Sequence, residues 1–232
     1  MILGFCGIAG SGKDTGANFL VQHENFVKVA LADPLKRICR DTFAFTDDQL
    51  WGPSDCRNAP DERFLRIPGG DERYDPMIGR TSITVAEYLT PRFALQQLGT
   101  EWGRNCYANV WVDYAIRTAK KILGPPNEHG NPYGYNAKTG VSDESGLCVR
   151  FSGVAISDVR FQNEIDAIRR AGGKLIRLLR GAGLSGAAGE HRSEAEIREI
   201  PDSEFDVVID NNEMTLPQFE AHVLQVVRSF SR

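Results

Sequence analysis

The stretch GIAGSGKDT, Gly7 to Thr15, decides the fold of this chain. It follows an apolar run, Ile2 to Cys6, and leads into a helical pattern, so the order is buried strand, glycine-rich loop and helix. Gly7 through Lys13 fits the pattern GxxxxGK of a phosphate-binding loop. A glycine turn with an incidental lysine is the alternative interpretation, and the strand and helix on either side count against it.

The chemistry of such a loop resides in its backbone and in one lysine. Glycines at positions 7, 10 and 12 bring successive N–H groups against phosphate oxygens, and the helix start adds partial positive charge. Lys13 reaches the β- and γ-phosphates and offsets charge as the transferred group leaves. We therefore predict that Lys13 is catalytic. The predicted ATP-binding residues here are Gly10, Ser11, Gly12, Lys13, Asp14 and Thr15.

The position after the lysine departs from the usual pattern. Ser or Thr, whose hydroxyl ligates magnesium, is usual there, but this chain has Asp14 and places a hydroxyl one residue later, at Thr15. Either side chain reaches a metal ion, directly or through water, and we select Thr15 as a metal ligand. A GKDT ending is more like that of nucleotide kinases than that of GTPases or motor ATPases.

Apolar runs of the buried, parallel type recur along the chain and alternate with helical patterns. The runs are 2–6, 26–31, 154–157, 174–179 and 206–209. The helical patterns between and after them are 13–21, 34–40, 161–171 and 216–230. This alternation predicts an α/β fold of the P-loop NTPase class, with a five-stranded parallel sheet flanked by helices. We expect a single kinase domain over residues 1–232.

A long excursion, residues 41–150, separates the second and third predicted strands. It contains helical patterns near 84–98 and 109–123, and we expect it to hold substrate specificity. Residues 51–79 are rich in Pro, Gly and charge, so they form a loop region or a binding flap. Residues 125–146 are more loop-like still, and a surface insertion without catalytic duty is the plainer interpretation.

A second polar group follows the third predicted strand, where Val154 to Ser157 ends in Asp158. Ligands of open α/β sheets bind at the carboxyl ends of the strands. We therefore predict that Asp158 holds a magnesium-bound water and that Arg160 clamps a phosphate, which makes both catalytic. The competing interpretation is that Asp158 only caps the helix that begins near Phe161.

Composition narrows the class of protein. The 232 residues are 41% hydrophobic and 25% charged, as in ordinary globular proteins, and the net charge of -4 argues against a surface that coats nucleic acid. Five scattered cysteines without a CxxC pair predict reduced thiols in a cytoplasmic protein. No apolar run approaches the roughly 20 residues that span a bilayer, so we expect no membrane partner.

The chain resembles the deoxynucleoside monophosphate kinases typical of tailed bacteriophages. The resemblance is collinear over most of the chain, and it rests on an ordered set of blocks. These are GSGKDT (10–15), LADPLK (31–36), RFALQQLGTEWGR (92–104), NVWV (109–112), SDVRFQNEID (157–166) and VVIDNN (207–212). Residues 51–79 and 125–146 differ from other members in length and composition, which leaves base selectivity open.

The resemblance implies a P-loop kinase with magnesium-ATP as donor, a deoxynucleoside 5′-monophosphate as acceptor, often a homodimer, and a place in the host cytoplasm if a phage encodes it. The nearest rival enzymes are other P-loop small-molecule kinases, acting on dephospho-coenzyme A or phosphomevalonate. A rival of another class is a non-catalytic ATP-gated binding protein. Such a protein binds ATP and forms no phosphorylated acceptor.

The resemblance also implies where the acceptor binds. Lys36 follows the second strand and is a candidate for the monophosphate, although a solvated helix lysine is an equal interpretation. Arg92 and Gln96 lie one helical turn apart, so one face presents a guanidinium to the phosphate and an amide to the base. The predicted acceptor-binding residues are Asp33, Lys36, Arg92, Gln96 and Arg104.

The donor side receives two further predictions. Residues 181–192, after Arg180, are rich in Gly and Ala with basic residues at both ends, and they resemble the lid that closes over ATP in nucleotide kinases. An ordinary flexible connection, with Ser193 capping the next helix, is the alternative. Asn211 falls where related kinases contact adenine, so Arg180 and Asn211 complete the predicted ATP site.

Overall fold

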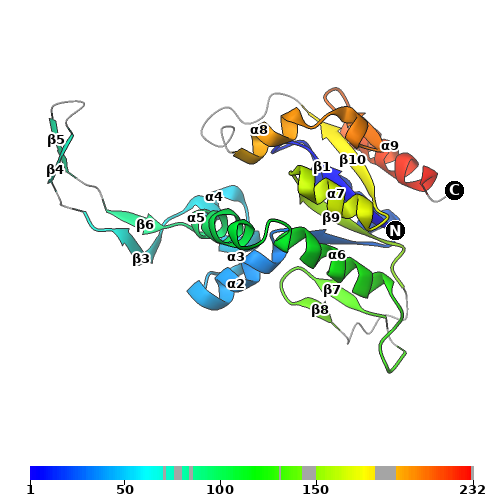
Figure 1. Ribbon diagram of the computed structural model, residues 1–232, viewed down its shortest axis with the longest axis horizontal. Helices are drawn as coiled ribbons and strands as arrows, with labels where there is room; N and C mark the ends of the chain where they lie inside the picture. Colours follow the sequence, from blue (N-terminus) through cyan, green and yellow to red (C-terminus); the bar gives the residue numbers. More distant parts are fainter. Residues whose placement is uncertain are drawn as a thin grey trace. The chain divides into compact units, whose positions relative to one another are not determined.

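A parallel sheet forms the centre of the protein in the computed structural model, which describes residues 1–69, 72–75, 80–83, 86–130, 132–142, 150–180 and 192–230. Its strand order is β11-β10-β1-β9-β2, and all neighbouring strands are parallel (Figure 1). The bounds are β1 Ile2–Cys6, β2 Phe26–Ala30, β9 Gly153–Val159, β10 Lys174–Leu179 and β11 Val207–Asp210. The predicted α/β class with a five-stranded parallel sheet is confirmed.

Helices cover both faces of this sheet, which explains why its strands are mostly apolar. They are α1 (Lys13–His23), α6 (Val110–Leu123), α7 (Gln162–Arg170) and α9 (Leu216–Ser229). Leu3 and Phe5 of β1 share a buried cluster with side chains of α1 and α9. Gly4 faces the opposite layer, because a Cβ there would lie 2.9 Å from Ile168 Cδ1 of α7.

The chain divides into two compact units, residues 1–33 with 107–232, and residues 34–106. Helix α6 belongs to the first unit, since it packs on β9 and α7. The structure therefore draws the limits of the inserted part at 34 and 106, whereas the sequence patterns suggested 41 and 150.

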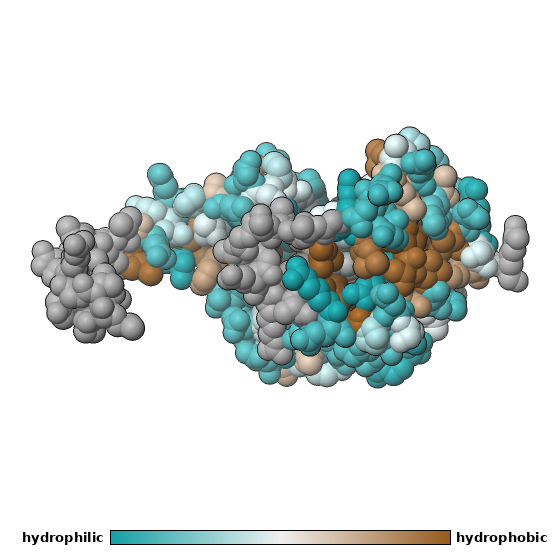
Figure 2. Space-filling model, turned by 90° about the horizontal axis from the view of Figure 1, so that it is seen from above, coloured by the Kyte–Doolittle hydropathy of each residue, from teal (hydrophilic) through white to brown (hydrophobic). Residues whose placement is uncertain are grey.

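On the face shown in Figure 2, hydrophilic residues predominate, with hydrophobic residues gathered on the part that holds the sheet.

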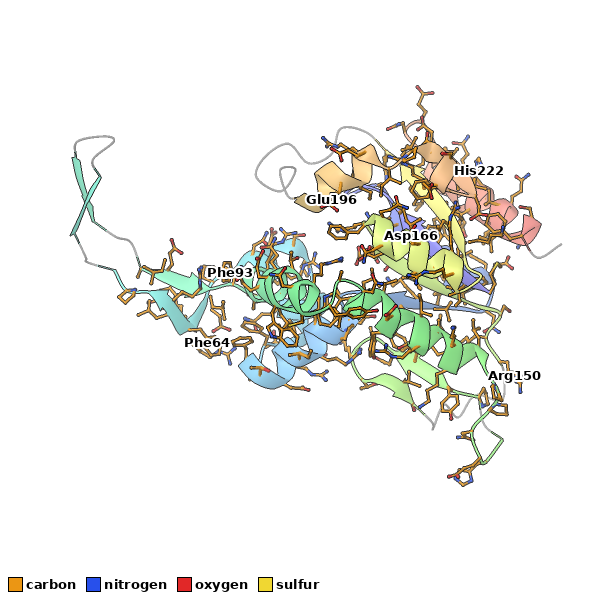
Figure 3. The ribbon with its side chains drawn as sticks, in the orientation of Figure 1. Phe64, Phe93, Arg150, Asp166, Glu196 and His222 are labelled. Carbon is orange, nitrogen blue, oxygen red and sulfur yellow. The ribbon has the colours of Figure 1, made fainter. Side chains whose placement is uncertain are left out.

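The second unit is built from short elements around a small core. They are α2 (Asp33–Phe43), α3 (Asp47–Trp51), α4 (Ser54–Asn58), β3 (Asp61–Ile67), β4 (Glu72–Asp75), β5 (Arg80–Ile83), β6 (Glu87–Leu89), α5 (Pro91–Gln96) and the π-helix η1 (Gln97–Arg104). Cys39, Phe45 and Leu50 are buried in this core. Phe64 of β3 and Phe93 of α5 pack against it (Figure 3).

Two sequence predictions for this unit can be compared with the structure, and the first is wrong at its amino-terminal part. A helix was expected over 84–98, but Glu87–Leu89 is a strand paired with β3, and the helix begins at Pro91. Thr90 sets that start, because its hydroxyl accepts a hydrogen bond from Phe93 N (3.1 Å) and Pro is favoured in the first turn. Residues 51–79, expected to form a loop region or a binding flap, include α4, β3 and β4 among the described residues.

The loop expected at 125–146 also contains regular structure. Strands β7 (Gly134–Asn136) and β8 (Gly140–Ser142) form a hairpin. The predicted lid, 181–192, lies outside the described residues except for Arg192, where helix α8 (Arg192–Glu199) begins. Within the described part of the chain, no helix has the length and apolar character needed to cross a membrane.

Candidate functional site

The loop after β1 has the backbone of a phosphate cradle. Gly10 and Gly12 have φ angles of 79° and 94°, in the left-handed region that favours glycine. Gly12 is also the N-cap of α1 and provides no side-chain cap, so the first-turn N–H groups of that helix are available to an anion. At Gly7, a Cβ would lie 2.3 Å from Ser11 Oγ and 2.7 Å from Leu178 O. The pattern in the sequence therefore corresponds to close backbone packing as well as to left-handed turns.

Lys13 lies across this loop. Its Nζ donates hydrogen bonds to Gly7 O (2.7 Å) and Ile8 O (2.7 Å), and the residue is only 5% exposed. The two carbonyls hold the ammonium group over the turn whose N–H groups would receive phosphate. This places the predicted catalytic lysine with the phosphate cradle.

Asn211, which directly follows the edge strand β11, supports the loop. Its Nδ2 donates to Ser11 O (3.1 Å), and its backbone N donates to Leu179 O (2.9 Å). Ser11 Oγ and Asn211 Oδ1 are buried and lack a hydrogen-bond partner among the described residues. Asn211 was predicted to contact the nucleotide, and the geometry places it behind the loop as a brace. Its neighbour Asn212 lines the adjacent cavity instead.

Asp14 and Thr15, the two candidates for magnesium, differ in their surroundings. The Asp14 carboxylate is 64% exposed and pairs with Lys28 Nζ of β2 at 3.3 Å. Thr15 is half-buried in the first turn of α1. Asp14 thus has a basic partner, which favours Thr15 as the residue beside a metal.

The end of β9 has an unusual backbone. Between Gly4 and Cys6 of β1 the register with β9 shifts by one residue, so two residues, Ser157 and Asp158, lie opposite one. Asp158 has φ 67°, a left-handed conformation that is uncommon for a residue with a side chain. Bulges often re-aim side chains beside active sites. Asp158 is therefore positioned by the bulge, and it does not act as the N-cap of α7, which is Phe161.

Arg160 and Glu164 complete this second turn. Arg160 Nη2 lies 3.8 Å from Asp158 Oδ1, a separation at the outer limit of an ion pair. Glu164 is 1% exposed, and its Oε2 accepts hydrogen bonds from Arg160 N (2.7 Å) and Phe161 N (3.2 Å). Sequence reasoning missed Glu164. The signal was present, because a Glu at the third helical position often bonds back to the start of its helix.

A cavity of about 250 Å³ opens beside the phosphate loop, at the carboxyl end of β10. Gly7, Leu179, Arg180 and Arg198 are among its lining residues. Arg180, predicted to bind ATP, is exposed, and it lines the same cavity as Gly7 of the phosphate loop.

Arg177 also lines the cavity, but its guanidinium has protein partners. It donates to Ile200 O (2.5 Å) and Ile197 O (3.1 Å) and pairs with Asp202 Oδ1 at 3.0 Å. These bonds attach the carboxyl end of α8 to β10. Arg177 therefore shapes the cavity wall, and this role was not anticipated from the sequence.

No nucleophilic thiol is provided at the loop. Cys6, the last residue of β1, is fully buried, and burial raises the pKa of its thiol to about 12. The thiol stays protonated near neutral pH, so this site offers hydrogen-bond donors and charges but no thiolate.

Asp33, predicted to bind the acceptor, is 3% exposed. Its Oδ2 accepts hydrogen bonds from Ala30 N (2.9 Å) and from Tyr135 Oη of the β7–β8 hairpin (2.7 Å). Tyr135 did not figure among the predicted residues, because 102 positions separate the two partners.

The other predicted acceptor residues lie in the second unit. Arg92 and Gln96 of α5 are both exposed, and Arg92 Nη1 donates to Asn58 Oδ1 at 3.2 Å. Lys36 Nζ lies 5.6 Å from the centre of the Trp51 ring, a cation–π contact. Arg104, the last residue of η1, is half-buried.

Comparisons with known proteins were made at the level of structure and of sequence. A solved shikimate kinase from Bacteroides thetaiotaomicron aligns with 100% of this chain and 99% of its own, with a TM-score of 0.44 and 11% sequence identity. No family model matches the chain.

A protein of Acanthamoeba polyphaga mimivirus, named "Putative deoxynucleotide monophosphate kinase", is 30% identical over 236 residues. The match covers 100% of this chain and 98% of the relative. The relative is viral, while the narrower bacteriophage origin stays a prediction. Because identity of this degree runs through the whole of both proteins, the chain belongs to the deoxynucleotide monophosphate kinase family.

Proposed function

We propose that this protein transfers the γ-phosphoryl group of ATP to a deoxynucleoside 5′-monophosphate. The products are ADP and a deoxynucleoside 5′-diphosphate. The observation that carries the proposal is the placement of two turns at the carboxyl edge of one sheet. Lys13 and the phosphate loop follow β1, and the bulged turn with Asp158 and Arg160 follows the neighbouring strand β9.

The donor half is supported by the loop and the cavity beside it. Loop N–H groups and Lys13 bind the phosphates of ATP, and the neighbouring cavity takes the rest of the nucleotide, with Arg180 at its wall. The volume of about 250 Å³ is near the lower end of ordinary ligand pockets, which suits part of a nucleotide.

Magnesium fits the oxygen donors at this edge. Thr15 offers a hydroxyl and Asp158 a carboxylate that is 29% exposed, and Ser157 Oγ is buried without a partner among the described residues. Magnesium prefers oxygen ligands and is usually held by one or two protein groups together with phosphates and water. Thr15 and Asp158 would hold the ion, which would neutralise charge on the nucleotide phosphates.

Transfer itself requires little covalent chemistry from the protein. An acceptor phosphate oxygen, already anionic, attacks the γ-phosphorus in line, and the bond from that phosphorus to the β,γ-bridging oxygen breaks, leaving its electrons on ADP. No general base is needed, so positioning and charge neutralisation by Lys13 and Arg160 suffice.

The residues proposed to bind the acceptor are Asp33, Lys36, Arg92, Gln96 and Arg104. A homodimer and a cytoplasmic location, which the resemblance implies, also stay predictions.

The test is a turnover assay with purified protein, magnesium-ATP and a panel of deoxyribo- and ribonucleoside monophosphates, scored by ADP release. Deoxynucleoside monophosphates should stimulate ADP formation above the background of Lys13→Ala. If none does, the proposed function is wrong. Binding of ATP without any phosphorylated acceptor would then support the non-catalytic alternative, and dephospho-coenzyme A and phosphomevalonate belong in the panel as rival acceptors.

A further inference from the structure

Hydrogen bonds join the chain between α6 and β9 to both ends of the edge strand β2, and the β7–β8 hairpin makes the bond at the carboxyl end. At the amino end, Asn25 Nδ2 donates to Arg150 O (2.9 Å) and Asn25 O accepts from Ser152 N (2.9 Å), which secures the segment that returns to β9 (Arg150 is labelled in Figure 3). At the carboxyl end, Tyr135 Oη donates to Asp33 Oδ2 at 2.7 Å. A surface insertion without a role would not require this part-buried bond at the carboxyl end of the strand.

The place of this bond in the sheet matters for its chemistry. Asp33 Oδ2 also accepts from Ala30 N, and Ala30 is in register with Ser157, the residue before Asp158. The bond therefore lies at the same carboxyl edge as the bulged turn. With the carboxylate only 3% exposed, two donors hold one of its oxygens and so restrict its orientation.

A carboxylate at this position cannot serve the acceptor's phosphate, because like charges repel. It can accept a hydrogen bond from a hydroxyl or an N–H group. Along a nucleoside 5′-monophosphate the order is phosphate, sugar and base, so a group near the reacting phosphates meets the sugar first. In a deoxyribose the sugar offers one hydroxyl, at the 3′ position.

We propose that Tyr135 is a positioning residue that orients the Asp33 carboxylate toward the 3′-hydroxyl of the acceptor. The proposal rests on the proposed function and adds a recognised group and the residue that prepares its recognition. It also gives the 125–146 insertion a part in acceptor selectivity.

The hairpin provides a matched control. Tyr133 lies two residues before Tyr135, and its ring contacts Lys121 Nζ of α6 at 4.5 Å. Tyr133→Phe and Tyr135→Phe each remove one hydroxyl, the first just before the hairpin and the second within it, but only the second removes the bond to Asp33.

The experiment compares kcat/KM for a deoxynucleoside monophosphate with that for its 2′,3′-dideoxy analogue. Wild type should prefer the 3′-hydroxyl by about 10- to 100-fold, the range of a hydrogen bond to a charged group. Tyr135→Phe should lower this preference about five- to tenfold, Asp33→Asn should remove most of it, and Tyr133→Phe should leave it within about twofold. The KM for ATP should change little in all three variants. A merely structural role would not alter a ratio between two acceptors.

Three results would overturn the proposal. Wild type could use both acceptors equally, Tyr135→Phe could keep the wild-type ratio, or Tyr133→Phe could lower the ratio as much as Tyr135→Phe. Absence of turnover with every monophosphate would instead overturn the proposed function itself. Thermal unfolding of the variants identifies any that fail to fold, and Asp33→Asn then carries the test of the carboxylate's role.

Discussion

Two strand-to-helix turns lie side by side at the carboxyl edge of the sheet, and they are built on opposite principles. The turn from β1 to α1 uses glycines at positions 7, 10 and 12 and presents its backbone. The turn from β9 to α7 contains no glycine, forces Asp158 into a left-handed conformation, and presents side chains. The first suits a phosphate chain that is bound the same way each time. The second suits an ion and a phosphate that must be met by particular charges.

Each turn also has a buried brace behind it. Asn211 holds the carbonyl of Ser11 in the first turn, and Glu164 holds the N–H groups of Arg160 and Phe161 in the second. In both cases the brace lies later in the chain than the turn it supports and is almost fully buried. The two turns are therefore held in place by buried hydrogen bonds before any ligand binds.

The largest expected effect on kcat comes from removing the side chain of Lys13, the charged group of the glycine turn. Lys13→Ala should lower kcat about 10²- to 10³-fold, equivalent to about 3 to 4 kcal/mol, because a preorganised charge at the transferred phosphate is lost. Lys28→Ala is the control, since among the described residues Lys28 pairs with exposed Asp14, and its loss should change kcat less than about fivefold. ADP release at saturating substrate measures both. A loss of less than tenfold in Lys13→Ala would mean that the backbone alone binds and activates the phosphates.

The side-chain turn is tested by three substitutions at one position. Asp158→Asn keeps a residue that tolerates the left-handed conformation and removes the charge, so kcat should fall about 10²-fold with little change in stability. Asp158→Gly should behave similarly. Asp158→Ala should lose the same activity and about 1 kcal/mol of stability as well, because its φ of 67° is unfavourable for alanine. Urea unfolding separates the two losses, and equal stability of all three variants would show that the backbone at 158 is not strained.

Two glycines in the first turn should differ in what they tolerate. Gly7→Ala should cost about 2 to 3 kcal/mol of stability, because the new Cβ would lie within 2.7 Å of Leu178 O and closer still to Ser11 Oγ. Gly10→Ala should cost only about 1 kcal/mol, since its φ is left-handed but no atom of the described residues lies within 4 Å of the new Cβ. Urea midpoints of the two variants test this order. A reversed order would place the tight approach elsewhere in the loop.

The smallest effect is expected at Asp14. Asp14→Ala removes an exposed pair with Lys28 and should change stability by less than about 0.5 kcal/mol and kcat by less than about twofold. Thr15→Val should instead raise the magnesium concentration needed for half-maximal activity by about tenfold, because it removes the proposed oxygen donor. Magnesium titrations of ADP release compare the two. A larger shift in Asp14→Ala would assign the metal to the carboxylate.

The central sheet could be predicted because both of its faces are covered. Burial on both sides makes Ile2–Cys6 apolar without interruption and leaves Lys174–Leu179 mostly apolar, and this pattern is visible in the sequence alone. The second unit has short elements with one exposed face, so Glu87–Leu89 was assigned to a helix when its pairing with β3 makes it a strand. Local propensity cannot reveal a partner strand about 20 residues away.

The candidate site divides in the same way. The phosphate loop was predictable because its residues are contiguous and its geometry follows from glycine and a helix start. The Tyr135–Asp33 bond was not, since its partners are far apart in sequence and a tyrosine in a loop-like stretch gives no signal. The left-handed backbone of Asp158 was also hidden, because it arises from a register shift between β1 and β9.

That register shift also limits how position 158 can drift during evolution. The backbone there admits few residues, chiefly glycine, asparagine and aspartate, and the proposed chemistry requires a carboxylate. Of these three residues only aspartate meets both demands, so we expect aspartate at this position in every relative that shares the proposed chemistry. The left-handed backbone and the proposed need for a carboxylate thus both favour the same amino acid at position 158.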